Sequence, residues 1–107
     1  MNSNKFNDVV QEQLKRCTDI LCVKADEYAA DDDRLHNFKA AAGYRGIDPK
    51  DALMGMATKH LVSISDMCKT GNQKTYSVSM WNEKITDAMN YMLLLRGLVE
   101  EEMEENK

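Results

Sequence analysis

Apolar residues recur at spacings of three and four along most of this chain, which is the pattern of amphipathic helices. One such stretch covers residues 4–30, and a short second stretch follows the acidic run at residues 31–33. A third begins at Asp48 and Pro49, because an aspartate before a proline favours a helix start, and continues to Cys68. The pattern predicts an all-α fold, a compact bundle of about four helices.

The fourth stretch runs from about Met80 to beyond Val99, after a predicted loop at residues 69–78 that Ser77 or Ser79 closes as a helix cap. Its apolar positions cover an unusually wide part of the helix surface. They are Met80, Trp81, Ile85, Ala88, Tyr91, Met92, Leu94, Leu95, Leu98 and Val99. Such a helix is central to a bundle or shared with another subunit, so we expect a homo-oligomer.

Length and charge divide the chain into one domain and a tail. With 107 residues it has the size of a single domain. The last eight residues hold five of the 18 acidic residues and one of the 14 lysines and arginines, so residues 1–99 carry 13 of each sign. We expect a helical domain at 1–99 and a frayed acidic end at 100–107. A neutral body argues against binding extended nucleic acid, which needs a basic face.

The sequence also argues against a membrane or an export route. No apolar run approaches the roughly 20 residues of a membrane span, and residues 1–13 lack the basic start and apolar stretch of a signal peptide. Three cysteines without a CxxC pair indicate neither a disulfide framework nor a zinc site. These observations predict a cytoplasmic protein without membrane contact.

Charged residues beside the apolar stripes of two helices are the first candidate chemistry. Lys24 and Glu27 fall beside the stripe of the first helix, and Glu83 and Asp87 are neighbours on the last. Carboxylates from facing helices can hold Mg²⁺ against a phosphate. The alternative is that Lys24 and Lys84 form ordinary ion pairs with these and other acids.

Basic side chains on the middle helices are the second candidate chemistry. Arg34, Lys59 and His60 could donate hydrogen bonds to a phosphate. His60 also follows the apolar stripe of its helix, where a histidine is commonly a hydrogen-bonded core residue. Glycine-rich phosphate loops, GxSxG turns and Cys/His nucleophile pairs are missing from the sequence, which excludes the common motifs of kinases and hydrolases.

A sparse set of motifs resembles a known superfamily. Lys24-Ala-Asp-Glu27-Tyr28, Arg34, Asn37-Phe38, Lys59, Glu83-Lys84-Ile-Thr-Asp87 and Asn90-Tyr91 together resemble small phage-type proteins that we associate with the all-α MazG-like nucleotide pyrophosphohydrolases. In that superfamily an ExxE pair and an ExxD pair bind magnesium, and water attacks between the α and β phosphates of a nucleoside triphosphate. Here Lys24 replaces the first acid of ExxE, and Glu83 and Asp87 are spaced as ExxxD.

Two functions follow from the residues and the resemblance. The first is a binding protein, phage-like, that holds a small phosphorylated nucleotide without a required cofactor and sequesters a nucleotide second messenger of host defence. Its predicted ligand-binding residues are Lys24, Tyr28, Arg34, Asn37, Phe38, Lys59, His60 and Lys84, with Trp81 as a further stacking candidate. The second is a magnesium-dependent nucleoside triphosphate pyrophosphohydrolase with Glu27, Glu83 and Asp87 as ligands, and Asp33 or Asp66 as a further one. A non-catalytic structural interaction module is a third possibility.

Overall fold

The computed structural model of the chain describes residues 1–23, 33–69 and 75–106. In order these residues form α1 (Ser3–Thr18), the π-helix η1 (Asp19–Val23), α3 (His36–Arg45), α4 (Pro49–Cys68) and α5 (Val78–Glu105). The part of the chain that the structure describes contains no β-strand. The prediction of an all-helical fold with four packed helices is therefore confirmed.

Side-chain caps explain where three of the helices begin. The side chain of Asn2 accepts a hydrogen bond from the backbone N–H of Lys5 at the start of α1. Asp48 does the same for Lys50, with Pro49 as the first residue of α4. Ser77 accepts from Met80 at the start of α5. Each cap satisfies a backbone donor that a helix leaves without an intrahelical partner, and those at Asp48 and Ser77 are the ones expected from the sequence.

A left-handed glycine ends α3. Gly46 has φ 64° and its backbone N–H reaches the carbonyl of Ala42, the arrangement in which glycine closes a helix without a Cβ penalty. The helix passes through Gly43, so only Gly46 acts as the stop. At the other end the N-cap position is Leu35, which makes no side-chain capping bond, while Asp33 accepts from the backbone N–H of Leu35 at 3.0 Å just before the helix.

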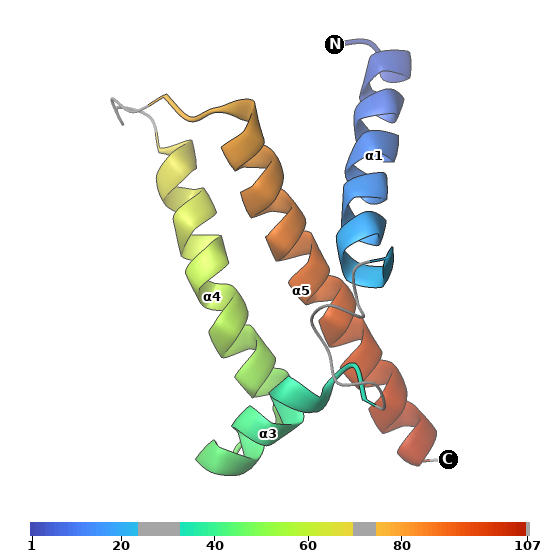
Figure 1. The fold of residues 1–107 in the computed structure, drawn as a ribbon, viewed down its shortest axis with the longest axis vertical. Helices are drawn as coiled ribbons and strands as arrows, with labels where there is room; N and C mark the ends of the chain where they lie inside the picture. The colour runs from blue at the N-terminus through green and yellow to red at the C-terminus, as the bar shows by residue number, and fades with distance from the viewer. Residues whose placement is uncertain (24–32, 70–74, 107) are drawn as a thin grey trace.

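Three long helices lie side by side, with α5 in the middle (Figure 1). α4 runs antiparallel to α5 on one side, and α3 crosses near the start of α4. α1 runs parallel to α5 on the other side. Gln13 Nε2 donates to Thr86 Oγ1 at 2.8 Å, and Cys17 Sγ lies 4.0 Å from Met89 Sδ. Because both residue numbers increase from the first contact to the second, the two helices point the same way.

The core lies where α3, α4 and the second half of α5 meet. Phe38, Leu53 and Leu98 are its buried large side chains, and Leu53 is completely inaccessible. Partly buried side chains pack around them, namely Leu35, Met56, Tyr91, Leu94 and Leu95. Among these side chains, Tyr91 lies nearest the middle of α5. It therefore connects the core to the site described below.

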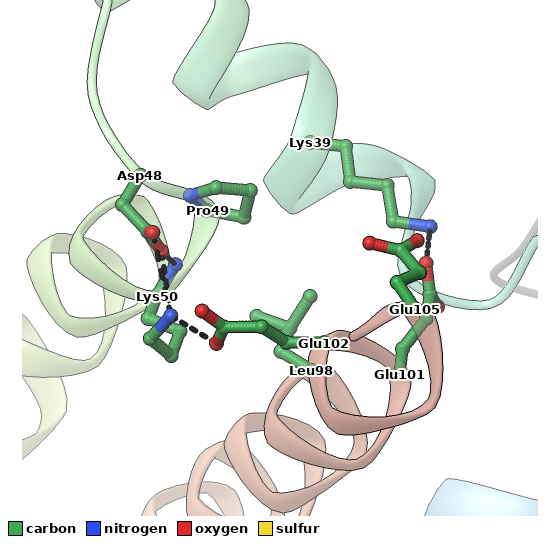
Figure 2. Close-up of a pocket in the computed structure, with 8 residues that line it drawn as sticks. All are labelled: Lys39, Asp48, Pro49, Lys50, Leu98, Glu101, Glu102 and Glu105. Atoms are coloured by element: carbon green, nitrogen blue, oxygen red, sulfur yellow. Dashed lines mark hydrogen bonds and ion pairs between the residues drawn. The ribbon is translucent and has the colours of Figure 1, made fainter. Parts of the chain in front are cut away.

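The acidic end of the chain is helical rather than frayed. α5 continues through Glu105, and Lys39 Nζ lies 2.5 Å from Glu101 Oε1 while Lys50 Nζ lies 2.5 Å from Glu102 Oε2 (Figure 2). These lysines come from α3 and α4, so they tie the last turns of α5 to both helices. The sequence reasoning missed this because acids at a helix C-terminus oppose the macrodipole, and only the fold brings the two lysines close enough to offset that repulsion.

The first α-helix ends earlier than the sequence pattern predicts. The sequence pattern indicated one α-helix over residues 4–30, whereas the α-helical geometry ends at Thr18 and a π-helical segment follows. Residues 24–30 of the predicted helix lie outside the described residues. None of the helices in the described part of the chain has the length and apolar content that a bilayer crossing requires.

Candidate functional site

A cleft of about 500 Å³ lies where η1, α4 and α5 approach one another. Its walls combine apolar, aromatic and charged side chains from four segments of the chain. The lining residues are Ile20, Leu21, Arg34, His60, Asp87, Asn90, Tyr91 and Leu94. We call this the central cleft. Its volume falls in the range of about 300 to 1,000 Å³ that small-ligand pockets occupy.

One face of α5 forms the floor of the central cleft. Asp87, Asn90, Tyr91 and Leu94 line it, and their spacing of three and four places them on one side of the helix. The Tyr91 ring lies edge-on to Phe38 of the core, with ring centroids 6.5 Å apart, and 5.0 Å from the ring of His60. Core packing therefore holds Tyr91 in place, and Tyr91 in turn supports His60.

The π-helical segment forms the opposite wall. Ile20 and Leu21 are consecutive residues of η1, and both line the central cleft. A regular α-helix turns successive side chains by about 100°, so a wider helical turn helps two neighbours to share one cavity. Single π-turns of this kind occur frequently at functional sites. The segment thus supplies an apolar surface directly opposite polar groups of α5.

His60 and Asp87 form a close pair of titratable side chains in the cleft. His60 Nδ1 lies 3.8 Å from Asp87 Oδ2, and both side chains are partly exposed. Burial raises the pKa of the Asp87 carboxyl above its usual value, and the neighbouring Glu83 adds to this, while His60 and Lys84 act in the opposite direction. The cleft therefore holds a carboxylate whose negative charge is only partly compensated by protein groups.

Arg34 gives the cleft a cation with free hydrogen-bonding capacity. It is exposed, lines the central cleft and lies two residues before α3. Among the described residues no side chain forms an ion pair with it. A guanidinium offers five donors in a fixed planar arrangement that matches a phosphate or carboxylate group, so Arg34 can bind an anion without giving up an ion pair to a described residue.

Asn90 is the most unusual polar residue of the site. Only 6% of its surface is exposed, and its Oδ1 is buried without a hydrogen-bond partner in the part of the chain that the structure describes. Leaving a buried acceptor unsatisfied costs about 1 to 3 kcal/mol. Thr86, one turn earlier, is even more deeply buried, but its hydroxyl accepts a hydrogen bond from Gln13. Asn90 Oδ1 is therefore a buried acceptor that forms no hydrogen bond with a described residue.

A second pocket of about 360 Å³ adjoins the central cleft. It is lined by Arg16, Asp19, Ile20, Asn82, Glu83, Thr86 and Asp87. Ile20 and Asp87 belong to both pockets, so they mark the boundary between them. The second pocket has an acidic character, with three carboxylates and one arginine, whereas among the residues that the structure describes Arg34 is the one side chain of fixed positive charge that lines the central cleft.

A third pocket, of about 390 Å³, lies at the C-terminal end of α5 (Figure 2). Its charged groups pair with one another: Lys39 contacts Asp33 and Glu101, and Lys50 contacts Asp48 and Glu102. These contacts lower the pKa of Asp33 and Asp48 and raise those of the two lysines. We interpret this pocket as part of the packing between helices, because every charged side chain that lines it, apart from Glu105, has a partner of opposite charge.

The structure brings together three of the residues that the sequence marked as candidates. Arg34, His60 and Asp87 line the central cleft, and Glu83 lies in the adjoining pocket. Other candidates line none of these three pockets: Asn37 and Lys59 are exposed, and Lys84 is partly buried. Lys24, Glu27 and Tyr28 lie outside the described residues.

Phe38 and Trp81 were expected to stack on a base, and the structure gives both a packing partner. Phe38 is buried in the core with 6% of its surface exposed, and Tyr91 rather than Phe38 lines the central cleft. Trp81 packs edge-on against Tyr76 with ring centroids 6.0 Å apart. An amphipathic stripe does not distinguish an aromatic residue in the core from one at the edge of a cavity.

The described residues do not assemble the magnesium site implied by the resemblance. No group of three or more His, Cys, Asp or Glu side chains within residues 1–23, 33–69 and 75–106 is arranged to hold a metal ion. Of the predicted ligands, Glu83 and Asp87 are near each other, while Asp33 pairs with Lys39 and Asp66 with Lys69. Glu27 lies outside the described residues.

Several cleft residues had no predicted role. Asn90 appeared only within the family resemblance, and Ile20, Leu21 and Leu94 were assigned to apolar stripes. A signal for Asn90 does exist in the sequence, because it is a polar residue between Met89 and Tyr91 in a strongly apolar helix. The apolar lining has no comparable signal, since nothing in the pattern separates cavity walls from packed surfaces.

Comparisons with known proteins add no further identification. The chain matches no protein-family model, no curated protein and no solved structure. The similarity to MazG-like pyrophosphohydrolases therefore stays a prediction from the sparse motifs, and the chemistry of the central cleft is the basis for a functional assignment.

Proposed function

We propose that this protein binds a small phosphorylated nucleotide in the central cleft and holds it without cleaving it. The observation that carries the proposal is the combination in one cavity of Arg34, which forms no ion pair within the described chain, with the ring of Tyr91 and an apolar wall. A ligand that matches these groups needs an anionic end and a flat, partly apolar end.

The shape and lining of the cleft support a nucleotide as that ligand. Its apolar wall, formed by Ile20, Leu21 and Leu94, and the ring of Tyr91 suit a flat base. Arg34 suits the phosphate, and His60 can add a further donor when it is protonated. In this proposal the protein acts by lowering the free concentration of the nucleotide, as expected of a protein that sequesters a signal.

The side chains available as metal ligands favour binding over magnesium-dependent hydrolysis. Mg²⁺ is commonly bound through carboxylates together with substrate phosphates. The described residues offer Glu83 and Asp87 without a third ligand, and Asp87 has a raised pKa because it is partly buried. We therefore expect binding to persist in the presence of a metal chelator, with the nucleotide recovered intact.

Calorimetry on the full chain tests this proposal. A panel of purine and pyrimidine nucleoside monophosphates, with the matching nucleosides, is titrated in the presence of EDTA. At least one monophosphate should bind more tightly than its nucleoside. Arg34→Ala should weaken that binding about tenfold or more, because a hydrogen bond to a charged group contributes about 1.5 to 3 kcal/mol.

Arg45→Ala is the matched control, because Arg45 is an exposed arginine at the end of α3 that lines none of the three pockets. Its affinity should equal that of the native protein. Absence of binding across the whole panel, or equal losses in both variants, would contradict the proposal. Release of pyrophosphate from nucleoside triphosphates on addition of Mg²⁺ would favour the hydrolase instead.

We also propose that the protein self-associates through the side of α4 and α5 that faces away from the cleft. Apolar residues recur along the outer side of both helices, every seven residues at positions 54, 61 and 68 of α4, and at spacings of three, four and seven at positions 81, 85, 88, 92 and 99 of α5. Spacings of this kind pack helices in coiled coils. Among these residues, Met54, Leu61, Ile85 and Met92 are 37 to 43% exposed.

On each helix this row is turned away from the residues that line the central cleft. Ile85 and Met92 lie two residues from Asp87 and Asn90, which turns them by about 200° around α5. Leu61 follows His60 directly and is turned by about 100° around α4. We call this surface the α4–α5 apolar face. A second copy of the chain would bury it while leaving the central cleft open.

A further inference from the structure

Arg34 lies in a hydrogen-bonded turn that leads from the central cleft into α3. The backbone N–H of His36 donates to the carbonyl of Asp33 at 3.2 Å, which closes a turn of four residues with Arg34 in its second position. The Asp33 carboxylate also accepts from the backbone N–H of Leu35 at 3.0 Å, a bond with which aspartate commonly stabilises a turn. The backbone of Arg34 is thus held on both sides, while its side chain lines the cleft.

This turn is attached to α5 at two points. Leu35 packs against the core, and its methyl carbons lie 3.7 Å from the position of a Cβ at Gly97 of α5. Lys39 Nζ lies 2.8 Å from Asp33 Oδ2 and 2.5 Å from Glu101 Oε1, so one ammonium connects the turn to the last turns of α5 (Figure 2). Its hydrogen bonds lower the pKa of Asp33 and raise the pKa of Lys39, so both keep their charges at neutral pH.

Anchoring of this kind matters for the affinity of an anion. Arg34 is exposed, and none of the described side chains forms an ion pair with it. Binding therefore has to order a long side chain, and a backbone that is fixed beforehand reduces this cost. The two parallel hydrogen bonds between a guanidinium and a phosphate also depend on direction, so a turn that shifts would weaken them.

We propose, building on the nucleotide-binding function above, that Lys39 is a positioning residue, whose bridge between Asp33 and Glu101 holds Arg34 in the direction that binds the phosphate. Lys39 lines the third pocket and not the central cleft, so it acts through Arg34 and does not touch the nucleotide. Loss of the bridge should weaken binding of the phosphate and leave the contacts of the base unchanged.

Lys50 provides a matched comparison, because it forms a bridge of the same construction (Figure 2). Its Nζ lies 3.2 Å from Asp48 Oδ1 and 2.5 Å from Glu102 Oε2, and its side chain is 34% exposed, as is that of Lys39. The Lys50 bridge attaches α4 to α5 and leaves out the turn that carries Arg34. If both lysines only stabilise helix packing, their removal has the same effect on binding, whereas positioning of Arg34 predicts a difference.

Calorimetry on the full chain tests this difference with AMP, GMP, CMP and UMP and with the matching nucleosides. Lys39→Met should weaken monophosphate binding about threefold or more, the scale of coupling within one hydrogen-bond network, and leave nucleoside binding unchanged. Lys50→Met should change neither, although both substitutions should lower the unfolding temperature. Lys39→Arg should restore the monophosphate affinity, because a guanidinium can also donate to two carboxylates.

A double substitution separates positioning from a general effect of charge. Removal of a positive charge can weaken anion binding over a distance without any change in geometry. If Lys39 acts through Arg34, Lys39→Met should cause no further loss of monophosphate affinity in an Arg34→Ala background. A general effect of charge would persist there.

The outcomes also separate this proposal from the one on which it rests. Equal effects of Lys39→Met and Lys50→Met on monophosphate binding, or an effect of Lys39→Met that persists without Arg34, would overturn the positioning role and leave nucleotide binding intact. If Lys39→Met does not fold, Asp33→Ala against Asp48→Ala decides by the same comparison, because each removes the capping end of one bridge. Absence of binding for every nucleotide would overturn both proposals.

Discussion

Individual backbone positions decide where the chain turns between α3 and α4. Gly46 has a left-handed conformation with φ 64°, whereas Gly43 lies within α3, and nothing lies within 4 Å of a Cβ placed at either position. Both positions therefore have room for a Cβ. Of the two, Gly46 alone has the left-handed backbone conformation that a side chain disfavours. A residue with a Cβ is strained in the left-handed region and favoured over glycine inside a helix.

This contrast makes a matched pair of substitutions informative. Gly46→Ala should reduce the free energy of unfolding by about 1 kcal/mol, because alanine must adopt a left-handed conformation. Gly43→Ala should increase it by roughly 0.5 to 1 kcal/mol, because alanine is the better helix former. Urea denaturation measures both. Equal effects of the two substitutions would contradict the assigned end of α3.

At the scale of elements, one aspartate links the start of α4 to the end of α5. Asp48 caps the first turn of α4 through the backbone N–H of Lys50, and its carboxylate also contacts the ammonium of Lys50. Lys50 in turn reaches Glu102. The hydrogen bonds from the Lys50 backbone and side chain lower the pKa of the Asp48 carboxyl. A local capping residue is thus also part of a contact between two helices.

Substitutions at Asp48 separate the cap from the charge. Asp48→Ala should lower the unfolding temperature at neutral pH, whereas Asp48→Asn should lower it less because asparagine is an equally good N-cap. A lowered pKa in the folded state contributes stability above the ordinary aspartate pKa, and this contribution is lost as pH falls through the folded value. The native chain should therefore lose more stability than Asp48→Asn on acidification, as measured by thermal unfolding between pH 7 and pH 3.

At the scale of the whole molecule, the chain is more extended than a domain of its length usually is. The Cα radius of gyration is 16.3 Å, compared with about 13 Å for a compact domain of about 100 residues. Figure 1 shows the reason, since α1, α5 and α4 form one row of helices rather than a closed bundle. An open row leaves helix faces uncovered, in agreement with the exposed apolar residues on α4 and α5.

The mass of the protein in solution tests the proposed self-association directly. Light scattering should find a mass larger than one chain for the native protein, and Met92→Lys should reduce it to that of a monomer, because a charge on the α4–α5 apolar face opposes its burial. Leu93→Lys is the control, because Leu93 is 47% exposed but points about 100° away around α5. A monomeric native protein, or the same loss with both variants, would contradict the proposed interface.

The amino-acid sequence by itself determined the helices and most of their ends. The 3.6-residue apolar pattern, the Asp48–Pro49 pair, the Ser77 cap and the glycine after α3 act over a few neighbouring residues, so their effects can be read without knowing the fold. The same holds for the closeness of Glu83 and Asp87, which are four residues apart on one helix.

Only the tertiary structure decided which polar residues share a cavity. Arg34, His60 and Asn90 are far apart in sequence, and helix packing alone brings them to one cleft. Packing also placed Phe38 in the core, Asn90 at a buried floor without a partner and the acidic end of α5 beside two lysines. These outcomes depend on how helices cross and on what each side chain meets, and a periodic pattern along one helix contains no information about its neighbours.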